Sequence, residues 1–111
     1  SLILENSVKK DLVFREKEMK ALVPYTSLVG DFLVFVQDHL GKKLPAREAG
    51  EAAVMEEGIN SGQKKLRKYG RKRIEAGKNV KAELLFIDFV RRLEQLGDNC
   101  YSISAALARL E

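Results

Sequence analysis

The stretch "ELLFIDFVRRLEQLGDNCYSIS", Glu83 to Ser104, decides the fold. Its apolar residues recur at intervals of three and four, so they lie on one arc of an α-helix. Glu94 and Asp98 stand one turn apart at the border of that arc, with Gly97 between them. Glycine is a poor helix former and carboxylates are poor core residues. We therefore expect this helix to approach a second helix closely at Gly97, beside a polar site.

The same periodicity extends over most of the chain and predicts three helices, at about 4–40, 45–76 and 79–110. Gly41 and Gly77 follow the first two helices, and Pro45 suits the first turn of the second. Pro24 is expected to kink the first helix or to mark a second start within it. The apolar arc of the third helix comprises Phe86, Phe89, Val90, Leu93, Leu96, Cys100, Ile103, Leu107 and Leu110. Long helices with short connections predict an all-α, antiparallel three-helix up-down-up bundle, as one domain over 1–111.

The composition narrows the class of protein. One cysteine excludes an internal disulfide, and one histidine excludes a His-rich metal site within one copy of the chain. No nucleophile–base pair or phosphate loop is visible, so we expect no enzymatic activity. No uninterrupted apolar run approaches the roughly 20 residues that a bilayer crossing needs. Because the chain begins at Ser1 rather than methionine, we expect a soluble piece of a longer protein, and a membrane-attached parent stays open.

Two features of the first two helices point to close packing. The stretch "SLVGDFLVFV", Ser27 to Val36, is apolar nearly all round, which favours burial by a second copy or a neighbouring domain. The second helix carries four glycines, each costing about 1 kcal/mol relative to alanine. Tight packing against the first helix is the simpler interpretation of them, and a nearby ligand is the other. These glycines are Gly50, Gly58, Gly62 and Gly70.

Glu94 and Asp98 project from one side of the third helix, where like charges repel unless a cation lies between them. The second helix offers Glu56 and Asn60 at the same spacing. If the two helices are neighbours, these pairs can face each other and hold a divalent or trivalent metal ion through oxygen ligands. The alternative is that the acids form ion pairs at the edge of the bundle, with Arg91, Arg92 or Lys65.

The run "KKLRKYGRKR" is strongly basic. A solvated face is the first interpretation, contact with anionic lipids or a partner the second, and nucleic acid the least favoured, because no nucleic-acid motif surrounds it. The basic residues are Lys64, Lys65, Arg67, Lys68, Arg71, Lys72 and Arg73.

The stretch that opens this section resembles the PhoU signature, in which an "FID" segment leads into "LERIGDHxxNI". The stretch "EEGINSGQKKLRKYGRKRIEAG", Glu56 to Gly77, is similar to the matching middle helix of that family, an acidic "EEEIN" or "EEEID" followed by a basic tract. The nearest resemblance is to PhoU-like domains at the cytoplasmic C-terminus of bacterial sodium/phosphate cotransporters. It covers the second and third helices by motif and the first by length and pattern.

The resemblance implies a single three-helix repeat that pairs as a homodimer, and a regulatory, non-catalytic role in phosphate transport. The domain would be cytoplasmic, tethered to the inner face of the membrane through a transporter domain. Family acidic motifs that bind metals in some members fall on Glu94 with Asp98 and on Glu56 with Asn60. Asp88 matches the "FID" acid. Asn60 replaces a common aspartate, which removes one negative charge from the expected cation site.

Two other functions remain open on the sequence. A stand-alone PhoU-type adaptor of phosphate uptake would have a start codon near Ser1 and no membrane helices encoded upstream. A basic helical nucleic-acid-binding module would bind with steep salt dependence through Lys64, Lys65, Arg67 and Lys68.

Overall fold

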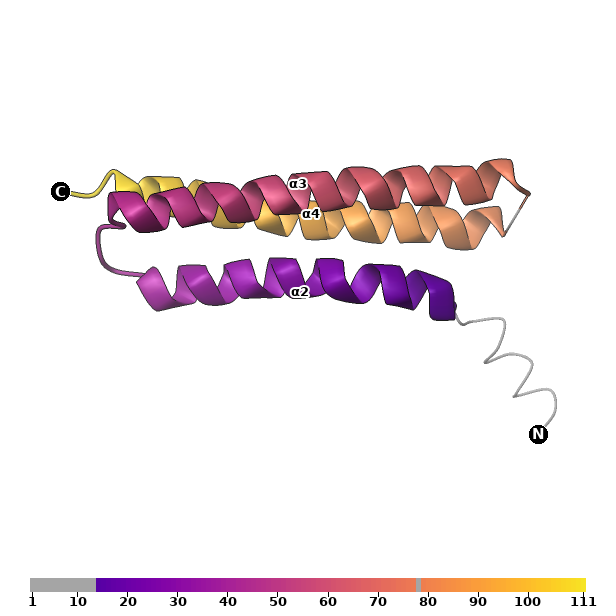
Figure 1. Ribbon diagram of the computed structural model, residues 1–111, viewed down its shortest axis with the longest axis horizontal. Helices are drawn as coiled ribbons and strands as arrows, with labels where there is room; N and C mark the ends of the chain where they lie inside the picture. Colours follow the sequence, from indigo (N-terminus) through magenta and orange to yellow (C-terminus); the bar gives the residue numbers. More distant parts are fainter. Residues whose placement is uncertain (1–13, 78) are drawn as a thin grey trace, which may run out of the picture.

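The computed structural model describes residues 14–77 and 79–111, and in these residues the fold is all-helical. Three helices pack side by side: α2 spans Glu16–His39, α3 spans Ala46–Glu75 and α4 spans Val80–Ala108 (Figure 1). The contact between α3 and α4 is the most extensive, and α2 lies against both. A three-helix bundle is therefore confirmed for the described part of the chain.

The largest difference from the expected helix bounds is at the start of α2. The periodicity predicts a helix from about Leu4, whereas α2 begins at Glu16. Residues 1–13 of that expectation lie outside the described residues. Phe14 and Arg15 are not helical, and the ring of Phe14 packs edge-on against Phe86 and Phe89, with centroids 5.9 and 5.6 Å away. The expected helix is therefore absent at residues 14–15, where Phe14 contacts α4.

Pro24 does not divide the first helix. α2 is continuous across Pro24, which lies on the exposed side, so the expectation of a second start there is wrong.

The connections between the helices are fixed by glycine conformation and by a helix cap. Gly41 and Gly77 adopt φ values of 84° and 74°, a region that favours glycine. The Asn79 side chain accepts a hydrogen bond from the Ala82 amide at 3.2 Å and so caps α4.

The core lies along the middle of the three helices and is built mainly from α2 and α4. Cys100 is buried in it, as the sequence predicts for a small apolar residue. The fully or nearly fully buried apolar residues include Leu22, Tyr25, Val29, Phe32, Ala52, Ile59, Phe86, Val90 and Cys100.

Only part of the predicted arc of α4 is buried. Phe89, Leu96, Ile103 and Leu110 are 40–44% exposed, although they lie on the predicted apolar arc. They stand seven residues apart and form a second apolar stripe beside the buried one. α2 and α3 cover only one side of α4. The three helices therefore bury one of the two apolar stripes and leave the other partly exposed.

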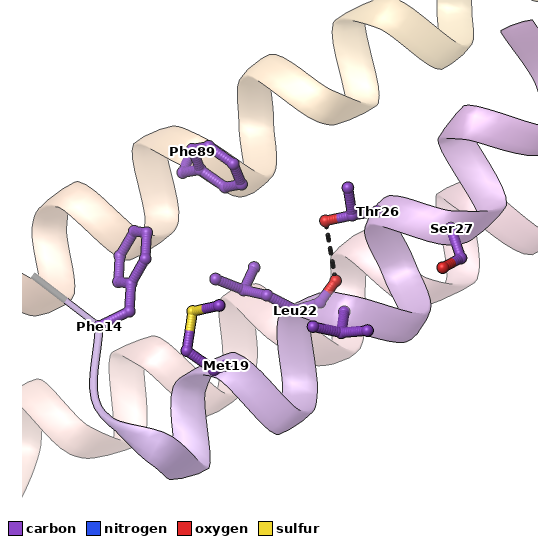
Figure 2. Close-up of a pocket in the computed structure, with 7 residues that line it drawn as sticks. Phe14, Met19, Leu22, Thr26, Ser27 and Phe89 are labelled. Carbon is purple, nitrogen blue, oxygen red and sulfur yellow. Dashed lines mark hydrogen bonds between the residues drawn. The ribbon is translucent and has the colours of Figure 1, made fainter.

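The outward side of α2 is also apolar, and a groove lies between it and α4. Phe14, Met19, Val23 and Phe89 line this groove, with Thr26 and Ser27 at its edge (Figure 2). The Thr26 hydroxyl donates a hydrogen bond to the Leu22 carbonyl at 2.9 Å, so this polar group is satisfied within its own helix. By length and composition α2 could cross a membrane, although core helices pass the same test.

An ion-pair cluster joins all three helices at one end of the bundle. The Arg73 guanidinium of α3 lies 2.9 Å from Glu18 of α2 and 2.5 Å from Glu83 of α4. Both glutamates are at least 95% buried, and each has one carboxylate oxygen without a hydrogen-bond partner. The start of α2, the end of α3 and the start of α4 therefore meet here. At the other end, the Leu44 amide donates to the Leu107 carbonyl at 3.0 Å.

We expect Arg73→Met to lower the free energy of unfolding by roughly 3 kcal/mol, because it leaves two buried carboxylates without a cation. Urea unfolding followed by circular dichroism measures this. Arg71→Met, at an exposed position of the same helix, is the matched control, with a change within about 0.5 kcal/mol. Adding Glu18→Gln and Glu83→Gln to Arg73→Met should restore part of the loss. Equal effects of the two arginine variants would show that the cluster does not stabilise the bundle.

Candidate functional site

The four residues expected to hold a cation lie together where α3 faces α4. The Asn60 amide donates to the Glu56 carboxylate at 3.4 Å along α3. The Glu56 carboxyl also contacts Asp98 of α4, and Glu94 lies beside Asp98. The structure therefore brings the two predicted pairs into one group, half-buried except for the exposed Asp98.

Gly97 explains why the two pairs lie opposite each other. A Cβ atom at Gly97 would lie 3.0 Å from both Cδ1 and Cγ2 of Ile59, a fully buried residue of α3. The close approach predicted at Gly97 is confirmed. Gly97 sits between Glu94 and Asp98, and Ile59 sits between Glu56 and Asn60. This backbone-to-side-chain contact thus places the two polar pairs at the same height along the bundle.

Two acids in this group, Glu56 and Glu94, hold protons more tightly than free carboxyls. Burial, followed by a hydrogen bond with Asp98 and the charge of Asp98, raises the pKa of Glu56 to about 7. Burial also raises the pKa of Glu94, as do the charge of Asp98 and a hydrogen bond with it. Arg67 acts in the opposite direction on Glu94. At neutral pH Glu56 is therefore partly protonated and does not carry a full negative charge.

The charges of this group also act on Tyr25 of α2, which the sequence did not predict. Tyr25 is 3% exposed, and its hydroxyl has no hydrogen-bond partner. Burial raises its pKa above the ordinary value, and so do the charges of Glu94, Asp98 and Glu56. Its place in the apolar stripe of α2 predicts burial but not which side chains of the other helices lie next to its hydroxyl.

The alternative interpretation of the acids as surface ion pairs holds only in part. Arg91 and Arg92 pair with Asp88, at 2.6 and 3.0 Å, so their expected pairing with Glu94 or Asp98 is wrong. These contacts lower the pKa of Asp88, mainly through its hydrogen bond with Arg92. The cation beside Glu94 is Arg67 of α3, a half-buried residue whose Nε has no hydrogen-bond partner.

Fewer residues of the basic run on α3 are exposed than the sequence suggests. Arg73 belongs to the ion-pair cluster with buried Glu18 and Glu83, so the expectation that it belongs to an exposed basic face is wrong. Arg67 is half-buried. The exposed basic side chains of the run are Lys64, Lys65, Lys68, Arg71 and Lys72.

The glycines of α3 have two different environments. A Cβ at Gly62 would lie 2.8 Å from the Tyr25 ring of α2, and one at Gly70 would lie 2.8 Å from Ile87 of α4. These two positions fit the interpretation of close helix packing. Gly50 and Gly58 face open space, and a Cβ there would meet nothing within 4 Å.

Alanine substitutions test the role of the Gly97–Ile59 contact. Gly58→Ala should raise the free energy of unfolding by about 0.5–1 kcal/mol, because alanine is the better helix former and the site is open. Gly97→Ala gains the same propensity but forces Ile59 to move, so it should be less stable than Gly58→Ala by about 1–3 kcal/mol. Thermal or urea unfolding measures both. Equal stabilisation by the two substitutions would contradict the close contact.

The raised pKa of Glu56 predicts a pH-dependent stability in metal-free protein. The unfolded chain loses this proton near pH 4.5 and the folded chain near pH 7. Between these values the folded state binds more protons, so stability falls as pH rises, by on the order of 1 kcal/mol. Glu56→Gln should remove this slope, and Glu57→Gln, at an exposed neighbour, should keep it. A ¹³C NMR titration that places the Glu56 carboxyl near pH 4.5 would contradict the account.

Within residues 14–77 and 79–111, no three histidine, cysteine, aspartate or glutamate side chains are arranged as a group that could hold a metal ion. The candidate site is the two polar pairs, Glu56 with Asn60 on α3 and Glu94 with Asp98 on α4, and these side chains are not preformed as a metal centre. No protein-family model matches the chain, and the comparisons with curated proteins and with solved structures give no match either.

Proposed function

We propose that this chain is a PhoU-like regulatory domain of a sodium/phosphate cotransporter, without catalytic activity, and that it responds to a cation bound between α3 and α4. The observation that carries the proposal is the register of the two polar pairs. Glu56 and Asn60 face Glu94 and Asp98 across the contact of Ile59 with Gly97. Both pairs fall on the acidic motifs of the family that the sequence resembles.

The donor set suits a hard cation. Carboxylate and amide oxygens are the ligands that such ions prefer. One oxygen of Glu56 accepts a hydrogen bond from Asn60, and no donor reaches the other, buried oxygen. Glu94 and Asp98 are half-buried and exposed, so their side chains have room to rotate toward a shared ion. A cation would offset the like-charge repulsion that raises the pKa of the acids.

The proposed architecture is one antiparallel, up-down-up PhoU-like repeat that pairs with a second copy. The antiparallel order is supported by the cluster of Arg73, Glu18 and Glu83 at one end and by the bond from Leu44 to Leu107 at the other. Pairing is supported by the exposed apolar stripe of α4 and the outward apolar side of α2. A seven-residue spacing of apolar residues is typical of helix–helix interfaces. Two copies packed through these faces would bury both.

The proposed location is the inner face of the cell membrane, through a parent transporter. The five exposed basic residues of the basic run on α3 favour contact with anionic lipid headgroups or an acidic surface of the transporter. Each such residue near an anionic membrane contributes about 1 kcal/mol of attraction. This attraction would orient the bundle on the membrane without inserting it.

The proposal predicts that Glu94→Gln combined with Asp98→Asn changes sodium-dependent uptake of ³²P-phosphate when introduced into the natural full-length gene. The same double variant, purified as the present chain, should lose the metal that elemental analysis finds in the wild type. Glu57→Gln lies on an exposed position of α3 and is the matched control, which should change neither measurement.

Unchanged phosphate uptake by the double variant would contradict the regulatory function. Equal metal content in the wild type and the double variant would contradict the cation site. Circular dichroism of both variants shows that the helical fold is retained, so that either loss is assigned to the carboxyls and not to unfolding.

A further inference from the structure

A strip of exposed residues runs along α4 with the spacing of a helix–helix seam. Its members recur at alternating intervals of four and three residues, the pattern by which one α-helix packs its side chains into another. All of them are exposed, and the four large apolar ones are 40–45% exposed. A strip of this pattern fits a second helix as its partner. This α4 seam comprises Leu85, Phe89, Arg92, Leu96, Asn99, Ile103 and Ala106.

A second strip with the same spacing lies on α2, beside the first. Three of its residues line the groove between α2 and α4, and Phe89 of the α4 seam lines the same groove from the other side (Figure 2). The three are Met19, Val23 and Thr26. The two strips therefore belong to one face of the bundle. This α2 seam comprises Met19, Val23, Thr26, Gly30, Leu33 and Gln37.

The middle of the α2 seam leaves room for another chain. Glycine is a poor helix former, yet Gly30 stands in the middle of the apolar stretch of α2. A Cβ at Gly30 would meet nothing within 4 Å, so packing within the described residues does not account for the missing side chain. A side chain from a second molecule can reach the backbone at this position.

We propose that a second copy of this chain packs on this face in the antiparallel direction, α4 against α4 and α2 against α2. The two-fold axis passes between Leu96 and Asn99, so that Leu96 of each copy faces Asn99 of the other. This inference rests on the pairing included in the proposed function, and it adds the direction, the register and the residues that meet.

Charge and size favour the antiparallel pair over a parallel one. In a parallel pair each seam residue faces its own equivalent, so Arg92 would face Arg92, and like charges in one interface repel. In the antiparallel pair Arg92 faces Ile103 of the second copy, and the bulky Phe89 faces its small Ala106. The two Arg92 residues are then about 16 Å apart along the helices, beyond the roughly 8 Å over which charges act at physiological salt. Each Arg92 keeps its ion pair with Asp88 of its own helix, at 3.0 Å.

The two seams are centred at the same height. Glu18 and Glu83 contact one guanidinium, so they mark equivalent heights on α2 and α4. The proposed axis lies between the residues 13 and 16 positions after Glu83, and Gly30 and Leu33 are 12 and 15 positions after Glu18. In the up-down-up order proposed above, α2 and α4 run in the same direction, so the two centres differ by about 1.5 Å. One axis therefore serves both seams, with Gly30 facing Leu33 of the second copy.

The face is large enough for a stable pair. The α4 seam is about 30 Å long and two neighbouring helices are about 20 Å wide, which gives roughly 600 Å² of flat area per copy. Side chains make the true surface larger than the flat area, and stable interfaces bury about 800 Å² per partner.

Cysteine cross-linking tests the direction of the pair. In a Cys100→Ala background, Phe89→Cys combined with Ala106→Cys should give a covalent dimer on mild oxidation. Either new cysteine alone should give about tenfold less, because equivalent positions are about 25 Å apart across the axis and a disulfide needs Cα atoms within about 7 Å. The same separation along one helix prevents a disulfide within a single chain.

Sedimentation equilibrium tests the seam itself. Leu96→Glu should raise the dissociation constant of the dimer about 100-fold, because it places two buried carboxylates beside the axis. Leu84→Glu is the matched control, since Leu84 is an exposed leucine of α4 outside the seam, and it should leave the constant unchanged. Asn99→Leu should lower the constant about tenfold, because a polar residue in a helix–helix seam costs stability.

The possible failures are distinguishable. Efficient cross-linking by Phe89→Cys alone or Ala106→Cys alone would show a parallel pair and overturn the antiparallel one, while the pairing of the proposed function stands. A wild type that stays monomeric at its highest soluble concentration, or a dimer that Leu96→Glu does not weaken, would overturn both the pairing through this face and its geometry. The cation site between α3 and α4 is tested separately by elemental analysis and is affected by neither result.

Discussion

The contact between Gly97 and Ile59 determines how α3 and α4 lie against each other. Without a side chain at Gly97, the backbone of α4 reaches the fully buried Ile59, and Cβ at that position would come within 3.0 Å of it. A close approach of two helices fixes their register, because side chains on either side must interdigitate. The acids flanking Gly97 and the polar pair flanking Ile59 are brought together as a consequence. The polar group between α3 and α4 therefore depends on an apolar contact.

Helix α2 is held against α3 and α4 by ion pairs as well as by apolar packing. Arg73 is shared by two buried carboxylates, one from α2 and one from α4, and burial of three charges is tolerated only because they are paired. Tyr25 packs on Gly62 further along α2. These two contacts hold α2 at two different positions along its length. The first contact is an ion-pair cluster at one end of the bundle, and the second is the packing of an aromatic ring on a glycine.

Much of this arrangement can be predicted from sequence, and the remainder cannot, for physical reasons. Periodicity identifies α3 and α4, and the Gly97 close approach follows from a glycine set in an apolar arc between two acids. Periodicity gives the direction of a side chain but not the residue that it meets on another helix. Arg73 therefore looks like one more member of a basic run, and Tyr25 like ordinary core. The arc of α4 also looks uniform, although three helices bury only one side of it and leave Phe89, Leu96, Ile103 and Leu110 exposed in part.

The account depends most on whether a cation binds between α3 and α4, at the height of Gly97. Anomalous diffraction at the manganese edge, from crystals of the chain grown with MnCl2, tests this directly. We expect an anomalous peak coordinated by the carboxylates of Glu56, Glu94 and Asp98. Helices packed as described here but with no peak between them, or with manganese only at other carboxylates of the surface, would contradict the central claim.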